Sequence, residues 1–229
     1  MKRIFSAVCL AGILTVSAYA DDMGKLTDRL ASATATVQEI MGTPDKGIPQ
    51  EIVADATCLA VIPGVKKAAF VIGGEYGRGV VTCRTGHGWS APAFITSSGG
   101  SFGFQIGAQS TDVILVAMNQ KGLQDLLKNK FKIGADAAAS AGPVGRNAKA
   151  GTDWKLNAEL LTYSRSKGLF AGIDLDGVVV SQSADDTRTF YGSDMPFETI
   201  LKGNIAVPSA AKMFVSTVAK YFVISKANS

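Results

Sequence analysis

Few side chains in this sequence have the type and spacing that catalysis requires. Its single histidine, His87, stands between two glycines within residues 85–88, a pattern that predicts a solvated hairpin turn rather than a general base. No G-x-S-x-G segment is present to expose a serine nucleophile, and the histidine and cysteines lack metal-ligand spacings such as C-x-x-C. We therefore predict no catalytic residue, no metal site and no cofactor.

The enzymatic alternative is a hydrolase whose carboxylates meet only in three dimensions. The candidates, which have no support from neighbouring residues in the sequence, are Asp136, Asp153, Glu159 and Asp174. Paired carboxylates with perturbed pKa values in a cleft would favour this alternative.

The glycine-rich segments resemble ligand-binding loops only in composition. Residues 73–79 lack the G-x-G-x-x-G order, and a valine-rich strand follows where a helix should begin. Residues 100–103 are not followed by Gly-Lys-Ser/Thr, and residues 174–177 lack the further ligands of a calcium loop. All three segments predict turns next to strands.

Basic residues beside predicted turns are the better candidates for binding. Turns at one end of a sheet would bring together Lys66, Lys67, Arg146, Arg165 and Lys167. Such a group would attract phosphate head groups. The alternative is that each is a solvated surface charge that serves solubility.

The N-terminus has the pattern of a secretory signal peptide. Lys2 and Arg3 precede an apolar run from about Ile4 to Val16, and Ala18-Tyr19-Ala20 forms an A-x-A cleavage site. The run is shorter than the roughly 20 apolar residues that span a bilayer. We therefore expect residues 1–20 to be removed and residues 21–229 to form a single exported domain; an uncleaved anchor is the alternative. Without Lys2 and Arg3, 21 basic residues face 19 acidic ones, so we predict no nucleic-acid partner.

Cleavage would leave two cysteines, Cys58 and Cys83. In an oxidising compartment this pair predicts one disulfide, and two buried free thiols are the alternative.

The pattern of apolar residues predicts helices at both ends of the chain and strands between them. Residues 23–41 and about 49–57 predict helices. The predicted strands cover residues 59–62, 69–72, 79–82, 89–95, 102–108, 112–118, 133–141, 156–166, 169–173 and 178–182. Asn119 would cap one inserted helix, and a short helix before Gly203 and another from Pro208 would follow the strands. This order predicts an α+β fold with a largely antiparallel, barrel-like sheet.

Several blocks of the sequence resemble the SYLF domain family. The blocks lie within residues 48–192 and comprise 62–68, 73–79, 89–94, 103–107, 141–146, 163–172 and 190–192. The resemblance implies a lipid-binding module, which eukaryotic members combine with SH3-type or FYVE-type modules and use to bind phosphoinositides. In those members a basic amphipathic N-terminal helix is implicated in membrane attachment. The helix predicted here is charge-balanced instead, with Lys25 and Arg29 against Asp28 and Glu39.

The sequence therefore predicts a non-enzymatic, lipid-binding protein of the bacterial periplasm. It would bind anionic phospholipid head groups at a membrane surface through Lys66, Lys67, Arg146, Arg165 and Lys167, or hold an acyl chain in an apolar cleft. The alternative function is a structural or protein-interaction module of the envelope without a lipid ligand. The sequence leaves the lipid and the oligomeric state open.

Overall fold

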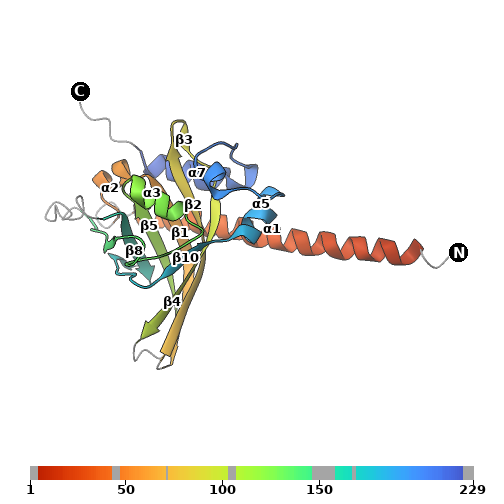
Figure 1. The fold of residues 1–229 in the computed structure, drawn as a ribbon, viewed down its shortest axis with the longest axis horizontal. Helices are drawn as coiled ribbons and strands as arrows, with labels where there is room; N and C mark the ends of the chain where they lie inside the picture. Colours follow the sequence, from red (N-terminus) through yellow and green to blue (C-terminus); the bar gives the residue numbers. More distant parts are fainter. Residues whose placement is uncertain are drawn as a thin grey trace.

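The computed structural model of the chain describes residues 5–42, 47–70, 72–102, 107–145, 158–166 and 169–223. Within these residues, side chains are described from residue 21 onward, except for 67–73 and 101–109. The described part confirms an α+β fold in which helices pack on a curled, mostly antiparallel sheet (Figure 1).

The described strands form one ten-stranded sheet with the order β6-β10-β4-β2-β1-β5-β8-β7, in which β3 pairs with β2 and β9 with β8. Their bounds are β1 Cys58–Phe70, β2 Ile72–Thr85, β3 Gly88–Trp89, β4 Ala93–Phe102, β5 Gly107–Ala117, β6 Lys130–Lys132, β7 Ala139–Ala141, β8 Leu160–Ser166, β9 Leu169–Gly172 and β10 Val179–Gln182. Only the β7–β8 pair is parallel among the described strand pairs. Hairpin connections between sequential strands explain this preference for antiparallel pairing.

Both faces of the sheet are covered, so its central strands are buried on two sides. Leu59 and Val61 of β1 belong to one apolar cluster, whereas Ala60 and Ile62 belong to the other. This alternation follows from the two-residue period of a strand. The first cluster packs against the long N-terminal helix, and the second fills the concave side of the curled sheet.

The helices lie on these two faces. Their bounds are α1 Phe5–Met41, α2 Gln50–Asp55, α3 Gln120–Leu127, α5 Ala184–Tyr191, α6 Phe197–Leu201, the 3-10 turn η2 Ser209–Ala211 and α7 Lys212–Tyr221. α1 crosses one face, and its N-terminal part projects away from the body (Figure 1). Leu26, Leu30, Ala33, Val37 and Ile40, which recur every three or four residues, bury the inner side of α1.

Several sequence predictions are confirmed in outline. The Asn119 side chain accepts a hydrogen bond of 2.9 Å from the Gly122 N–H and caps α3 as predicted. His87 is exposed in the turn between β2 and β3. Helix α5 was not predicted, although Asp185 in its first turn and Gly192 with φ of 73° after its end are typical of helix ends.

The prediction that Lys66 and Lys67 lie in a turn between two short strands is wrong. Both belong to β1, which continues from Cys58 to Phe70. Pro63 and Gly64 form an irregularity within the strand, because the pairing register with β2 shifts between Val61 and Lys66. A β-bulge allows a strand to continue past a proline that would otherwise interrupt its hydrogen bonds.

Cys58 and Cys83 lie directly opposite each other in β1 and β2 and form a disulfide, with Cα atoms 4.0 Å apart. Both are fully buried in the concave cluster. The bridge joins two strands at the centre of the sheet and closes a loop with a sequence separation of 25.

We predict that replacing both cysteines by alanine lowers the free energy of unfolding by about 3 kcal/mol, because the denatured chain regains the entropy of an open loop. Chemical denaturation measures the change. A strong reductant should destabilise the parent protein and leave the double variant unaffected. Equal denaturation midpoints for parent and variant would contradict the prediction.

Candidate functional site

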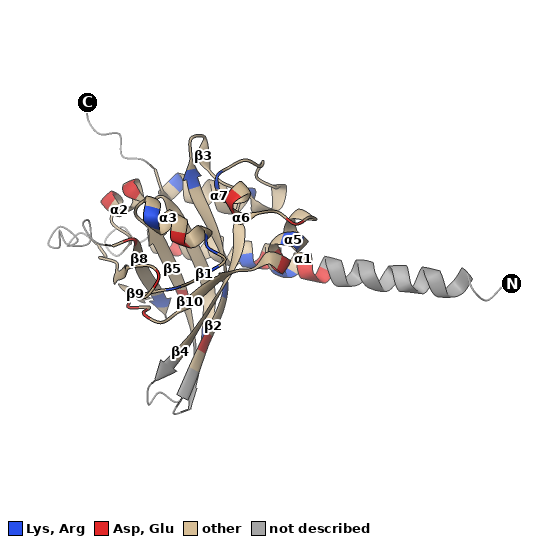
Figure 2. Cartoon of the chain, viewed as in Figure 1, with Lys and Arg blue, Asp and Glu red and all other residues tan. Residues whose placement is uncertain are grey.

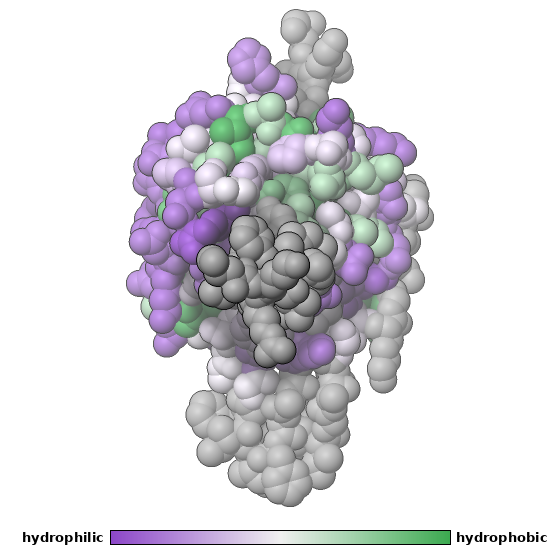
Figure 3. Space-filling view, turned by 90° about the vertical axis from the view of Figure 1, so that its right-hand side faces the viewer, coloured by the Kyte–Doolittle hydropathy of each residue, from purple (hydrophilic) through white to green (hydrophobic). Residues whose placement is uncertain are grey.

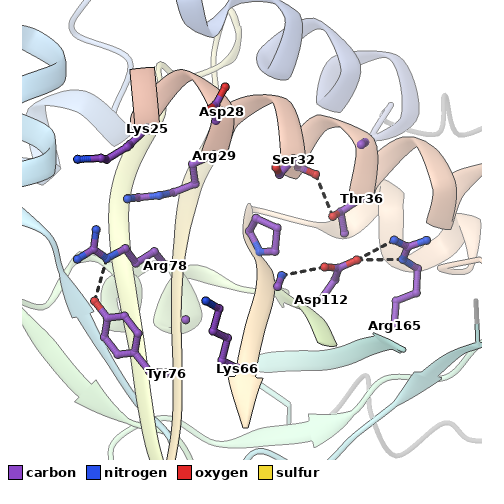
Figure 4. Close-up of a pocket in the computed structure, with 14 residues that line it drawn as sticks. Lys25, Asp28, Arg29, Ser32, Thr36, Lys66, Tyr76, Arg78, Asp112 and Arg165 are labelled. Carbon is purple, nitrogen blue, oxygen red and sulfur yellow. Dashed lines mark hydrogen bonds and ion pairs between the residues drawn. The ribbon is translucent and has the colours of Figure 1, made fainter. Parts of the chain in front are cut away.

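A groove of about 800 Å³ runs between α1 and the sheet (Figure 4). Its walls come from α1, from the Pro63–Gly64 bulge of β1, and from β2, β5 and β8. The polar side chains that line it are Lys25, Asp28, Arg29, Ser32, Thr36, Lys66, Tyr76, Arg78, Asp112 and Arg165. The groove therefore gathers five cationic side chains from four separate elements.

Arg29 fixes the α1 wall to the rest of the fold. Its side chain is 7% exposed, and Nη1 lies 2.6 Å from Oδ2 of Asp186 at the start of α5. The guanidinium also lies over the Phe94 ring, 5.4 Å from its centroid. Because Arg29 is buried and forms an ion pair with Asp186, it joins α1 to α5 and is less available to bind a ligand.

Asp112 is the centre of a network that joins three strands and α1. Its Oδ1 accepts a hydrogen bond of 2.9 Å from the Gly64 N–H, and its Oδ2 accepts one of 3.0 Å from Arg165 Nε. Arg165 Nη2 lies 2.9 Å from the same oxygen, and Nη1 pairs with Glu39 of α1. The network holds Gly64 in a left-handed conformation with φ of 61°, which glycine adopts without strain.

Lys66, Tyr76 and Arg78 form the floor of the groove. Lys66 in β1 lies opposite Tyr76 in β2, and Arg78 follows two residues later on the same face of the strand. Arg78 Nε donates a hydrogen bond of 3.0 Å to the Tyr76 hydroxyl, which raises the pKa of Arg78. We refer to these three residues as the groove floor.

The groove floor differs from the other cations in its pairing. Lys25 pairs with Asp21 at 2.5 Å and with Asp22 at 3.0 Å, whose hydrogen bonds raise the lysine pKa. Among the described residues, neither Lys66 nor Arg78 forms an ion pair, and the carboxylate of Asp28 points away from both (Figure 4). These two cations are therefore the ones most available to an anion.

The surface around the groove is mixed in charge. Lys and Arg residues and Asp and Glu residues are both spread over the described helices and strands (Figure 2). On the face from which α1 projects, apolar residues are interspersed with hydrophilic ones (Figure 3). An anion at the groove floor would thus meet a local pair of cations rather than a broad positive field.

Two of the five predicted binding residues, Lys66 and Arg165, line the groove. Arg165 is already held by two carboxylates, so its described role is structural. The side chain of Lys67 and all of Arg146 and Lys167 lie outside the described residues. Arg78 and Tyr76 were not predicted from the sequence as binding residues, although their spacing of two residues in a strand would have placed both on one face.

The concave side of the sheet offers little room for an acyl chain. Within the described residues it contains a cavity of about 10 Å³ lined mainly by aliphatic side chains, among them Ile62, Val113 and Leu175. That space holds at most about one water molecule. Burial of an acyl chain here would require the sheet to open.

In the described residues the candidate carboxylates of the enzymatic alternative do not pair with one another, whereas Glu159 forms a side-chain hydrogen bond with the buried Asp125. Asp136 accepts a hydrogen bond of 2.8 Å from the Lys132 N–H, and Glu159 pairs with Lys121. Asp174 accepts one of 2.9 Å within its own turn, and Asp153 lies outside the described residues. Within the described part of the chain, no three His, Cys, Asp or Glu side chains gather closely enough to hold a metal ion, and no helix is long and apolar enough to cross a membrane.

Comparison with known families matches residues 98–221 to the family described as "Ysc84: Las17-binding protein actin regulator". The match covers more than half of the chain and includes β5, β8 and the C-terminal helices. The chain belongs to the Ysc84 (SYLF) family.

Similar proteins come from several eukaryotes. The chain is 36% identical over 172 residues to the SH3 domain-containing YSC84-like protein 1 of Xenopus laevis, covering 74% of this chain and 51% of that protein. It is 35% identical over 168 residues to an SH3 domain-containing protein of Schizosaccharomyces pombe, covering 72% and 39%. For Protein YSC84 of Saccharomyces cerevisiae the identity is 33% over 171 residues, covering 73% and 36%. The chain thus spans about half or less of these relatives.

We predict that Asp112→Ala lowers the free energy of unfolding by about 2–3 kcal/mol, because it removes charge-assisted hydrogen bonds to Gly64 and Arg165. Thermal or urea denaturation measures this loss. Asp28→Ala is the matched control, since Asp28 is an acid of the same groove without a described ion pair, and it should change stability by less than about 0.5 kcal/mol. Equal losses in the two variants would show that the Asp112 network does not stabilise the fold.

Proposed function

We propose that the protein is a non-enzymatic, peripheral phospholipid-binding protein of the bacterial envelope. The groove floor would hold the phosphate of an anionic head group. The observation that carries the proposal is the pair Lys66 and Arg78, which lie beside each other in an open groove without a carboxylate partner among the described residues. The N-terminal signal-peptide pattern supports an exported, periplasmic location.

The chemistry of the groove floor suits a phosphate group. An arginine guanidinium presents several donors that match phosphate oxygens, and a lysine ammonium adds a compact charge. The rigid network around Asp112 sets the position of the neighbouring bulge, so the floor is formed before any ligand arrives. Preorganisation lowers the cost of ordering side chains on binding.

Flotation of the purified protein with liposomes tests the proposal. We expect co-flotation with vesicles that contain phosphatidylglycerol, little with phosphatidylcholine alone, and weakening at high salt, because exposed charges are screened. Lys66→Glu/Arg78→Glu should weaken binding to anionic vesicles about tenfold or more, given roughly 1 kcal/mol per basic residue near an anionic surface.

Lys130→Glu/Lys132→Glu is the matched control. It makes the same change in net charge on exposed residues of the edge strand β6, outside the groove. If both double variants lose binding equally, the effect comes from overall charge and the groove floor is not the site. Absence of flotation under every condition would refute membrane binding.

Binding of a protein partner is the second candidate function. The family description names a Las17-binding actin regulator, and two of the three relatives described above are named as SH3 domain-containing proteins. A second groove, of about 360 Å³, lies between α1 and the C-terminal helical segment and includes Ala31, Ala210 and Phe214. At its rim, Met213 is 67% exposed. A partner that filled this groove could also cover the exposed Met213 side chain and remove its apolar surface from water.

Co-sedimentation with purified actin filaments separates the two functions. If the protein serves as a filament-binding module, it should pellet with filaments, and Met213→Asp should reduce the pelleted fraction. If it acts at lipid alone, it should stay in the supernatant while still floating with anionic vesicles. Leu169→Asp, a change at another exposed apolar residue, is the control.

A further inference from the structure

A row of charged side chains crosses the sheet beneath α1. Lys66 of β1, beside Arg78 in the groove floor, lies opposite Ser110 of β5, two positions before Asp112. Asp112 in turn lies opposite Arg165 of β8. Arg165 lies at one end of the groove and Arg78 at the other (Figure 4). Since only β5 separates β1 from β8, the two strands are about 10 Å apart.

Asp112 holds Arg165 in position from one side. Arg165 Nε donates a hydrogen bond of 3.0 Å to Asp112 Oδ2, and Nη2 lies 2.9 Å from the same oxygen. The remaining nitrogen, Nη1, pairs with Glu39 of α1. The guanidinium is therefore already oriented at the end of the groove, and Glu39 takes up the nitrogen that Asp112 does not hold.

The contact with Glu39 is the weaker of the two. The Glu39 side chain is 52% exposed, whereas that of Asp112 is 16% exposed. Exposed ion pairs stabilise a fold little, because water screens the charges and two long side chains must be ordered. Glu39 also lies in the last turn of α1, where the helix dipole disfavours a negative charge. A ligand can therefore replace Glu39 at a small cost in free energy.

We propose that Glu39 acts as an internal competitor of the head group, and that a phosphate entering the groove replaces it at Nη1 of Arg165. The inference deepens the proposed function and rests on it. The groove floor makes the first contact, and Arg165 becomes a third cation for the ligand once Glu39 turns away. The groove volume of about 800 Å³ lies in the range of small-molecule sites, so one head group has room to contact both.

The exchange needs the movement of one side chain and not of the helix. Val37 and Ile40, which flank Glu39, are 1% and 3% exposed and keep α1 packed on the apolar cluster beneath it. Arg29 still joins α1 to Asp186 of α5. The apparent affinity for an anion is then reduced by the fraction of molecules in which Glu39 occupies Arg165. Glu39 thus sets how strongly the groove binds.

Glu39→Gln removes the competing charge and keeps the size of the side chain. We expect it to bind about two- to fivefold more tightly to vesicles of phosphatidylglycerol and phosphatidylcholine in equal parts, measured by flotation over a range of lipid concentrations. Glu198→Gln is the matched control. It makes the same change in net charge and breaks a similarly exposed ion pair, that of Glu198 with Lys202, outside the groove.

Arg165→Lys tests whether the gain acts through Arg165. A lysine keeps a positive charge beside Asp112, but it lacks the planar fork that lets one guanidinium contact two anions. In this background, Glu39→Gln should bind no more tightly than Glu198→Gln. Thermal denaturation checks that the variants fold. The comparison of Glu39→Gln with Glu198→Gln in the parent protein tests the inference even if Arg165→Lys fails to fold.

The outcomes separate this inference from the proposed function. Equal affinities of Glu39→Gln and Glu198→Gln overturn the inference and leave binding at the groove floor intact. A gain for Glu39→Gln that persists with Arg165→Lys also overturns it, because the effect would then come from charge alone. If neither the parent protein nor Glu39→Gln floats with the vesicles, both the inference and the proposed function are wrong.

Discussion

The hydrogen bond between the Gly64 N–H and Asp112 fixes the feature on which the rest of the site depends, the bulge in β1. Before the bulge, β1 is buried on both faces and contributes to two apolar clusters. The extra residue shifts the alternation, so Val65 packs with the concave cluster, as Ile62 does, and Lys66 faces the groove. Without that shift, Lys66 would face the concave core, where an unpaired charge is costly.

The same carboxylate couples the bulge to the helix that covers it. Asp112 orients Arg165, and Arg165 reaches Glu39 near the end of α1. Arg29 makes the second connection by pairing with Asp186 of α5. The groove is therefore fixed at two points of the covering helix, Arg29 and Glu39, by ion pairs. For the buried pair of Arg29 with Asp186, removing one partner would destabilise the fold by more than the pair stabilises it, because the remaining charge is left uncompensated.

The sequence predicted the fold class and most elements because the apolar periodicity of α1 and the strands is strong. Short strands were predicted in place of β1 and β2, because Pro63-Gly64 and Gly73-Gly74 are typical of turns. The pairing register, which shows that the strands continue, is not known from the sequence. The groove depends on contacts between residues far apart, such as Arg165 with Glu39, and spacing within one segment cannot indicate them. Lys66 was found because it stands beside Lys67 and a proline-glycine pair. Arg78 could be placed on the same face as Tyr76 only once both residues were known to belong to one strand, β2.

Most cations near the groove are already paired, so electrostatic attraction at the groove alone would give weak and salt-sensitive binding. Lys25, Arg29 and Arg165 each have a carboxylate partner, whereas Lys66 and Arg78 form no ion pair among the described residues. Selectivity for an anion at this groove would therefore rest on the groove floor.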